Sequence, residues 1–137
     1  MNKSGIRVLK QIPDNLSKIH FDQDYLRQIL DNIFNNAIDA IDEARRPKDQ
    51  SVITIKGRQV ENRTLNIRLE IGDTGTGIPE KIKDKIFKSW FTTKGEKGTG
   101  LGLALVSELI LRGGGTVEVE SEEGKGSTFI LGLKGVQ

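Results

Sequence analysis

The sequence predicts an α+β domain, a two-layer sandwich in which helices cover one face of a mixed, mostly antiparallel sheet. Several short segments have strand patterns, and they follow one another in runs instead of alternating strictly with helices. Two longer segments have helical periodicity. The 137 residues suffice for one hydrophobic core. We therefore expect a single domain over residues 1–137.

The first elements are a strand and a long helix. Residues 6–12 alternate apolar and polar side chains, which predicts a strand, and a second short extended piece is expected at 18–21. From residue 24 to about residue 44, apolar side chains recur at i, i+3, i+4 and i+7, as in an amphipathic helix. Asp22 is a suitable N-cap for this helix, and Pro47 with its charged neighbours ends it.

The remaining elements form most of the sheet. Residues 52–60 and 65–71 predict two strands joined at 61–63, and the second alternates as a half-buried strand does. Residues 88–100 are too polar to predict a packed element. The other expected elements are a glycine-rich turn at 73–79, a short helix at 80–87, a helix from about 100 to 111 stopped by the glycines at 113–115, and strands at 116–121 and 127–133.

The composition excludes several classes of function. Lys and Arg number 21 against 19 Asp and Glu, and this near-balance argues against a nucleic-acid-binding protein. The absence of cysteine excludes disulfides, thiolate metal sites and Cys nucleophiles, and the single histidine disfavours a His-based metal site. No segment has the apolar length of a signal peptide or a membrane span. We expect a cytoplasmic domain without membrane contact, even where its parent protein is membrane-anchored.

Three polar side chains stand out on the long helix. At about 100° per residue, Asn32, Asn36 and Asp39 fall on one line that borders the apolar stripe. Polar groups at the edge of a core cost free energy unless they are paired. Their amide and carboxylate oxygens suit a hydrated Mg²⁺ ion that holds phosphates. Hydrogen bonds to loops or neighbouring strands are the alternative, and the helix alone favours it.

Two glycine-rich segments suggest a nucleotide site. Asp73 ends the alternating strand, where a carboxylate can accept a hydrogen bond from an exocyclic amine. Gly75 and Gly77 let the backbone approach a flat ring or take positive φ. Residues 98–103 (GTGLGL) lead into a helix, so their amides suit phosphate, although the spacing matches neither a dinucleotide-binding unit nor a Walker loop. Taken alone, the first segment is more typical of an ordinary turn, and the second is a weak signal.

Taken together and in order, these segments resemble the GHKL superfamily, which has the Bergerat ATP-binding fold, and within it the sensor histidine kinases. The resemblance covers residues 6–133, nearly the whole chain. Its motifs are QILDNIFNNA at 28–37 for the N box, DTGTGIP at 73–79 for the G1 box, IFKSWFTTK at 86–94 for the F box, GTGLGL at 98–103 for the G2 box, and GKGSTF at 124–129 for the closing glycine-threonine segment.

The resemblance implies a site for ATP and Mg²⁺. Asn36 would coordinate the metal and Asn32 would join the same phosphate-side network, which makes these two the catalytic residues. Asp73 would accept a hydrogen bond from the adenine amine, assisted by Thr128. Residues 88–100 would form a flexible ATP lid, and Phe87 would either anchor that lid or simply pack in the core. The further residues placed around the nucleotide are Asp39, Gly75, Gly77, Ile78, Phe87, Thr92, Thr93, Lys94, Gly98, Thr99, Gly100, Leu101, Gly102 and Leu103.

One position distinguishes transfer from hydrolysis. ATP-hydrolysing members of the superfamily carry a glutamate one helical turn before the magnesium asparagine, where this chain has Asn32. An amide is not a useful general base, so phosphoryl transfer is favoured over fast hydrolysis. His20 lacks the acidic and proline neighbours of a phosphoacceptor motif, and we interpret it as structural.

The resemblance therefore implies the catalytic domain of an ATP-dependent protein histidine kinase in two-component signalling. The helix that dimerises and carries the phosphoacceptor histidine is expected outside these residues, and the domain is expected to be inactive as an autokinase without it. The second expected partner is the receiver domain of a response regulator. Two alternatives stay open: a GHKL-type serine kinase acting on an anti-sigma partner, and a nucleotide-sensing pseudokinase module.

Overall fold

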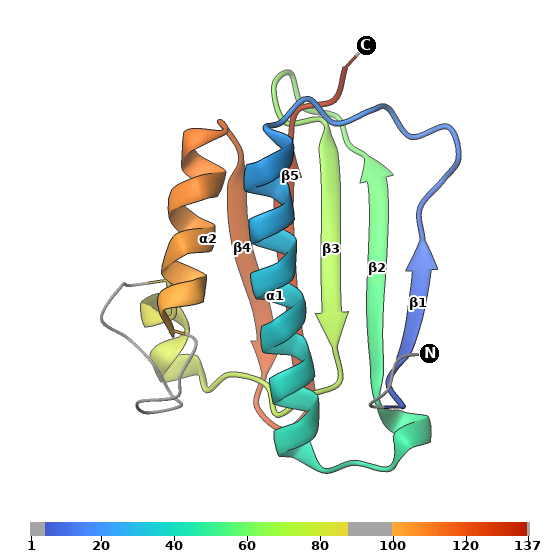
Figure 1. Cartoon of the computed structure of the whole chain (residues 1–137), viewed down its shortest axis with the longest axis vertical. Coiled ribbons are helices and arrows are strands. Elements are labelled where there is room, and N and C mark those ends of the chain that lie inside the picture. The colour runs from blue at the N-terminus through green and yellow to red at the C-terminus, as the bar shows by residue number, and fades with distance from the viewer. Residues whose placement is uncertain (1–4, 88–99, 137) are drawn as a thin grey trace.

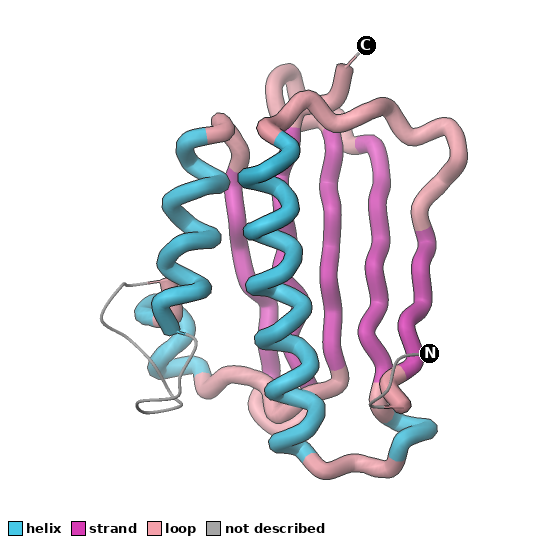
Figure 2. The backbone as a smooth tube through the Cα atoms, in the orientation of Figure 1, coloured by secondary structure: helices cyan, strands magenta, loops and turns pink. Residues whose placement is uncertain are grey.

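The computed structural model describes residues 5–87 and 100–136, and it confirms the two-layer α+β architecture (Figure 1). One layer is a five-stranded sheet, and the other contains helices α1 and α2, which lie on the same face of that sheet (Figure 2). The elements are β1 (Arg7–Gln11), α1 (Gln23–Ala44), the 3-10 helix η1 (Lys48–Gln50), β2 (Val52–Gln59), β3 (Ile67–Asp73), the 3-10 helix η2 (Glu80–Lys85), α2 (Gly100–Arg112), β4 (Thr116–Glu122) and β5 (Gly126–Leu133).

The sheet is mixed and mostly antiparallel, as predicted. Its strand order is β1-β2-β3-β5-β4, and only the pair β1–β2 is parallel among the strands that the structure describes. Strand β5 lies beside β3, so the end of β3 meets the beginning of β5, with Asp73 opposite Ser127. This register brings two segments far apart in the sequence to one end of the sheet.

Helix α1 is stabilised by a side-chain N-cap at its start and by apolar side chains that recur along one face. The backbone N–H of Tyr25 donates to the Oδ1 atom of Asp22 at 2.9 Å, which confirms the predicted N-cap. Ile29, Ile33, Ala37 and Ile41 recur every four residues and are buried, so one stripe of the helix faces the sheet. Burying an isoleucine side chain in this way contributes about 1.5–3 kcal/mol.

The core lies between the two layers. From the sheet it receives Ile71 and Leu131, and from α2 it receives Val106 and Ile110, all at most 1% exposed. Neither α1 nor α2 combines the length and the apolarity needed to cross a bilayer, within the ranges 5–87 and 100–136.

Three local expectations differ from the structure, and one short element was not expected. Residues 18–21 form no strand, because only Ile19 bridges to Gly135 where the chain crosses the end of the sheet. Strand β3 starts at Ile67 and not at residue 65, because the Asn62 side chain accepts the N–H groups of Thr64 and Leu65 and holds them in the loop. The short helix at 80–87 is the 3-10 helix η2, and the sequence did not predict η1.

Candidate functional site

The candidate site lies at the end of the molecule where β3 finishes and β5 begins. The C-terminal half of α1, the loop after β3, the turn between β4 and β5 and the N-terminal end of α2 all reach this end (Figure 1). The structure therefore places the glycine-rich loop that begins at Asp73 against the C-terminal half of α1.

Asp73 is a half-buried carboxyl group at the last position of β3. Its Oδ1 atom accepts the backbone N–H of Gly75 at 2.8 Å. Burial raises the pKa of Asp73 from 3.8 to about 6, against the lowering effects of the Gly75 and Ser127 amides and of the Arg46 charge. The group is consequently an ionised acceptor at neutral pH and becomes protonated in mild acid.

The two glycines after Asp73 fit the loop closely against its neighbours. A Cβ atom at Gly75 would lie 2.5 Å from the Cβ of Ala40, and the N–H of Thr76 donates to the Ala40 carbonyl at 3.2 Å. Gly77 has φ +73°, where a side chain would be strained and would also meet the Glu122 carbonyl. The expected positive φ is therefore found at Gly77. Gly75 serves the close approach instead, because the absence of a side chain lets the loop pack against α1.

Ser127 is a site residue that the sequence analysis missed. It lies directly opposite Asp73 in the β3–β5 ladder, so both side chains share the helix-covered face. Ser121 donates to the Gly126 carbonyl at 2.9 Å and accepts the Ile78 N–H at 2.7 Å. Because the one hydroxyl proton of Ser121 is used, Ser127 donates in the 2.8 Å contact between the two hydroxyls. The Ser127 oxygen is then an acceptor beside the carboxyl group.

Thr128, which the resemblance placed beside Asp73, lies on the opposite face of the sheet. It pairs with Gly72, and a Cβ atom at Gly72 would lie 3.1 Å from its Oγ1 atom. Asp73 and Thr128 border the same depressions, but their side chains alternate to opposite faces of the sheet. The alternation along β5 is the sequence pattern that could have identified Ser127. Phe129, Leu131 and Leu133 are buried, and Ser127 lies two residues before Phe129, so its side chain points to the same face.

The flank of α1 agrees with the expected arrangement at two of its three polar positions. Asn32 and Asn36 are half-buried at the edge of the apolar stripe, and Asp39 is exposed. The Nδ2 atom of Asn36 donates to the backbone carbonyl of Asn32 at 2.7 Å. Since this amide nitrogen faces the helix backbone, the Oδ1 atom of Asn36 is directed away from that carbonyl. An amide oxygen is the atom type that a hard cation such as Mg²⁺ requires.

The apolar residues assigned to the site belong mainly to the core. Ile78 packs against it, and Leu103 is 9% exposed within it. The Phe87 ring meets the Phe129 ring edge-on at 6.2 Å, so core packing is the described role of Phe87. Gly100, Leu101 and Gly102 begin α2. Thr92, Thr93, Lys94, Gly98, Thr99 and the rest of the expected lid up to residue 99 lie outside the described residues.

Arg46 is the second residue that the sequence analysis did not single out. Its guanidinium donates to the carbonyl of Gly75 at 2.8 Å and also to the carbonyls of Thr74 and Gly124. One side chain thus contacts both loops that border Asp73 and Ser127.

Comparison with known proteins agrees with this geometry. A family of histidine kinase-, DNA gyrase B- and HSP90-like ATPases matches residues 21–137. The chain belongs to this ATPase family. The resemblance to the sensor histidine kinases of the GHKL superfamily is thereby confirmed, and the domain is a histidine-kinase-type ATPase domain.

Individual members of the family are similar over almost the whole chain. Sensor histidine kinase ZraS of Escherichia coli K12 is 42% identical over 132 residues, which are 96% of this chain and 26% of that protein. The catalytic domain of histidine kinase ThkA, solved without nucleotide, has a TM-score of 0.78 at 28% identity and covers 97% of this chain and 81% of its own.

A third member was solved with a nucleotide analogue. Full-length ShkA in complex with AMPPNP has the same TM-score and identity, and the match covers 98% of this chain and 27% of ShkA. The ATPase domain described here thus spans about a quarter of the length of ZraS and of ShkA.

Proposed function

We propose that this ATPase domain binds Mg·ATP and transfers the γ-phosphoryl group to a histidine on a separate dimerisation helix, in two-component signalling. The observation that carries the proposal is that the loop after the acceptor pair Asp73–Ser127 contacts α1 at Ala40, and that the same helix carries Asn32 and Asn36 on its flank. The acceptor pair suits an adenine amine, and the asparagine flank suits metal-bound phosphates. The family membership and the AMPPNP complex of ShkA support the same nucleotide.

The adenine end rests on hydrogen-bond chemistry. The exocyclic amine of adenine has only protons to donate at this edge of the ring. An ionised Asp73 and the Ser127 oxygen are both acceptors, and the Ser121–Gly126 contact fixes which way the Ser127 proton points. The site therefore accepts an amine in direct contact with the pair and disfavours a carbonyl at the same ring position.

The phosphate end uses oxygen ligands and backbone amides. Asn36 would offer its Oδ1 atom to Mg²⁺, and Asn32 would hold Asn36 in this orientation through its carbonyl. When bound, Mg²⁺ supplies neutralisation of the phosphate charge. The beginning of α2 at Gly100 supplies backbone N–H groups and the positive end of a helix dipole at this end of the molecule.

The residue at position 32 favours transfer over hydrolysis. Asn32 is an amide one helical turn before Asn36, and it cannot take a proton from water. Phosphoryl transfer to an imidazole nitrogen forms the N–P bond and breaks the bond to the β,γ-bridging oxygen, leaving ADP. The contribution of the domain is to position the nucleotide and to neutralise its charge.

The proposed partners lie outside the described domain. They are the helix that dimerises and carries the phosphoacceptor histidine, and the receiver domain of a response regulator. We place the domain in the cytoplasm, whether or not its parent protein is anchored in a membrane.

The test is transfer in trans. The domain is incubated with γ-labelled ATP, Mg²⁺ and a separate acceptor-helix protein, and the acid stability of the label is measured. Acid-labile, base-stable phosphate on the acceptor is expected, and the Asn36→Asp variant should abolish it. Acid-stable phosphate would instead identify a serine kinase, and nucleotide binding without any transfer would identify a nucleotide-sensing module.

A further inference from the structure

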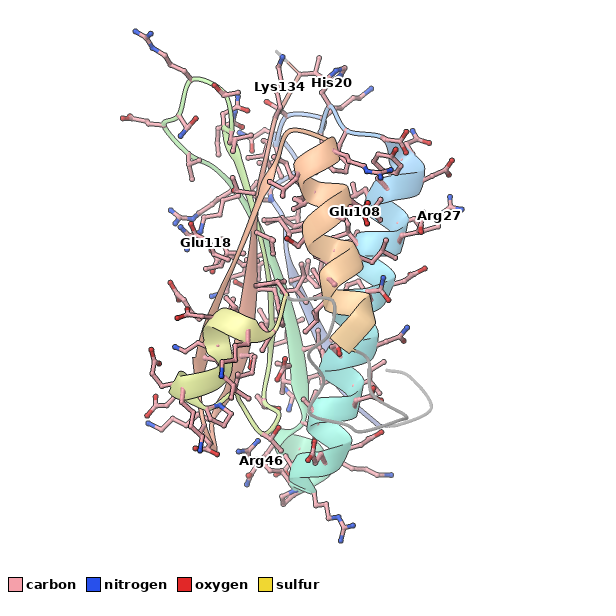
Figure 3. All side chains as sticks on the ribbon, turned by 90° about the vertical axis from the view of Figure 1, so that its left-hand side faces the viewer. His20, Arg27, Arg46, Glu108, Glu118 and Lys134 are labelled. Atoms are coloured by element: carbon pink, nitrogen blue, oxygen red, sulfur yellow. The ribbon has the colours of Figure 1, made fainter. Side chains whose placement is uncertain are left out.

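Helix α1 ends in a sharp turn. Arg45 follows the last helical residue with φ 54°, in the left-handed region that non-glycine residues rarely adopt, and its N–H donates to the Ile41 carbonyl at 3.3 Å. Because the chain leaves the helix axis at once, the next residue, Arg46, lies at the end of the molecule that holds the candidate site (Figure 3).

The Arg46 guanidinium joins two loops that are distant in sequence. It donates to the carbonyls of Thr74 and Gly75, which follow Asp73, and to the carbonyl of Gly124 in the turn between β4 and β5. Arginine is suited to this role because its planar fork presents several N–H donors in fixed directions. A lysine carries the same charge but cannot hold three carbonyls in that fixed plane.

The carbonyl groups that Arg46 contacts lie in the two segments that flank Asp73 and Ser127. The N–H of Gly75 donates a hydrogen bond to the Asp73 carboxylate, and Gly124 is three residues before Ser127. The positive charge of Arg46 also lowers the pKa of Asp73, opposing the burial that raises it. Both the position and the ionisation of the acceptor pair therefore depend on one side chain.

We infer that Arg46 is a positioning residue for purine recognition, which holds the loop after β3 and the β4–β5 turn so that Asp73 and Ser127 accept an adenine amine. This inference rests on the proposed nucleotide site. Guanine has a carbonyl where adenine has the amine, so a correctly placed acceptor pair disfavours GTP. Loss of Arg46 lets the loops separate and reduces the preference for ATP over GTP.

Asp73 has other charged neighbours, which must be held constant in any test. From β2 and β3 these are Lys56 and Glu70, and from β4 and the following turn they are Glu120, Glu122 and Lys125, since they line the same depressions as Asp73. None of them is changed by a substitution at position 46. Among the described residues, Arg46, which follows α1 and its cap Arg45, is the side chain whose positive charge lowers the pKa of Asp73.

The experiment compares three variants. Arg46→Ala removes both charge and fork, and Arg46→Lys keeps the charge alone. The control Arg27→Ala removes an equal charge from the exposed part of α1, far from Arg46 (Figure 3). Affinities for Mg·ATP and Mg·GTP are measured by calorimetry, and the Asp73 carboxyl is titrated by carbon NMR in the nucleotide-free protein. General loosening of the fold would expose this carboxyl and lower its midpoint, whereas loss of the Arg46 charge raises it.

For Arg46→Ala we expect the Kd for ATP to rise about tenfold and the ATP-over-GTP preference to fall by a similar factor, because guanine has a carbonyl and no amine at this ring position and so has no such contact to lose. The titration midpoint of Asp73 should move upward. Arg46→Lys should lose the preference while its midpoint stays near that of the parent. Arg27→Ala should match the parent in both measurements.

A folded Arg46→Ala variant with the parental preference and midpoint would overturn the inference. Should that variant not fold, a parental preference in Arg46→Lys overturns it equally. Asp73→Asn separates the two proposals: if it binds ATP as the parent does, the nucleotide site itself is wrong. If it loses ATP while both Arg46 variants keep the parental preference, only the role of Arg46 is wrong.

Discussion

At the scale of single residues, the site depends on a carboxyl group that is ionised although it is largely buried. In its charged form Asp73 has only acceptor oxygens, and its raised pKa means that the fold disfavours that charge. In the proposed site, this energetic cost serves the recognition of an adenine amine. Binding of an amine donor to the charged carboxyl group would then offset part of this energetic cost.

This cost should appear in the pH dependence of stability. Between pH 4 and 6 the folded protein binds more protons at Asp73 than the unfolded chain does, so its free energy of unfolding falls as pH rises through this range. Asp73→Asn should remove up to about 3 kcal/mol of that fall. Urea unfolding from pH 4 to 7.5 measures it, with exposed Asp31→Asn as a control for net charge. An unchanged slope in Asp73→Asn would contradict the assignment.

Two neighbouring residues of β5 give opposite expectations. Ser127→Ala should weaken ATP binding about 5- to 30-fold, because it removes an acceptor on the face of Asp73. Thr128→Ala should have a smaller effect, because Thr128 lies on the other face. Calorimetric titration of both variants decides between them, and a larger loss in Thr128→Ala would restore the assignment made from sequence.

The amide at position 32 should limit hydrolysis. Asn32→Glu places a carboxylate one helical turn before Asn36, where it can take a proton from water. We expect ATP hydrolysis to rise by about tenfold or more, since general-base catalysis contributes 10²–10⁴-fold when the geometry is complete. Asn32→Gln is the matched control, which adds the same length without a base. Equal hydrolysis in both variants would refute the role given to this position.

At the scale of elements, the loop after β3 is supported by α1 and not by the sheet alone. Gly75→Ala would place a methyl group against Ala40, so it should lower the free energy of unfolding by about 1–3 kcal/mol and weaken ATP binding as the loop moves. Thermal unfolding and calorimetry measure the two effects. Parental stability in this variant would show that the loop does not rest on the helix.

Elements also show what the sequence can predict and where it fails. The stripe Ile29, Ile33, Ala37 and Ile41 and the cap Asp22 are local patterns, so the helix and its buried face followed from the sequence. Strand register is not local, because the pairing of Asp73 with Ser127 joins residues that no short pattern relates. The role of Arg46 was hidden for the same reason, since its partners are 28 to 78 residues away.

At the scale of the whole molecule, the nucleotide should act as a stabilising ligand. Mg·ATP at a hundred times its Kd should raise the free energy of unfolding by about 2.7 kcal/mol, because it binds only the folded state. Asp73→Asn and Asn36→Asp should each reduce this gain at the same ATP concentration. Thermal unfolding with and without Mg·ATP measures it, and full stabilisation of both variants would place the pocket elsewhere.

The direction of β1 has a consequence for how a partner reaches the site. Because β1 is parallel to β2, Arg7 pairs with Val52, next to the residue that faces Asp73. A polypeptide joined ahead of β1 would therefore enter at the end of the sheet that holds Asp73, whereas β5 finishes at the opposite end (Figure 1). A covalent connection of this kind would raise the local concentration of an attached substrate to about millimolar, so that even weak binding between the substrate and this domain becomes frequent.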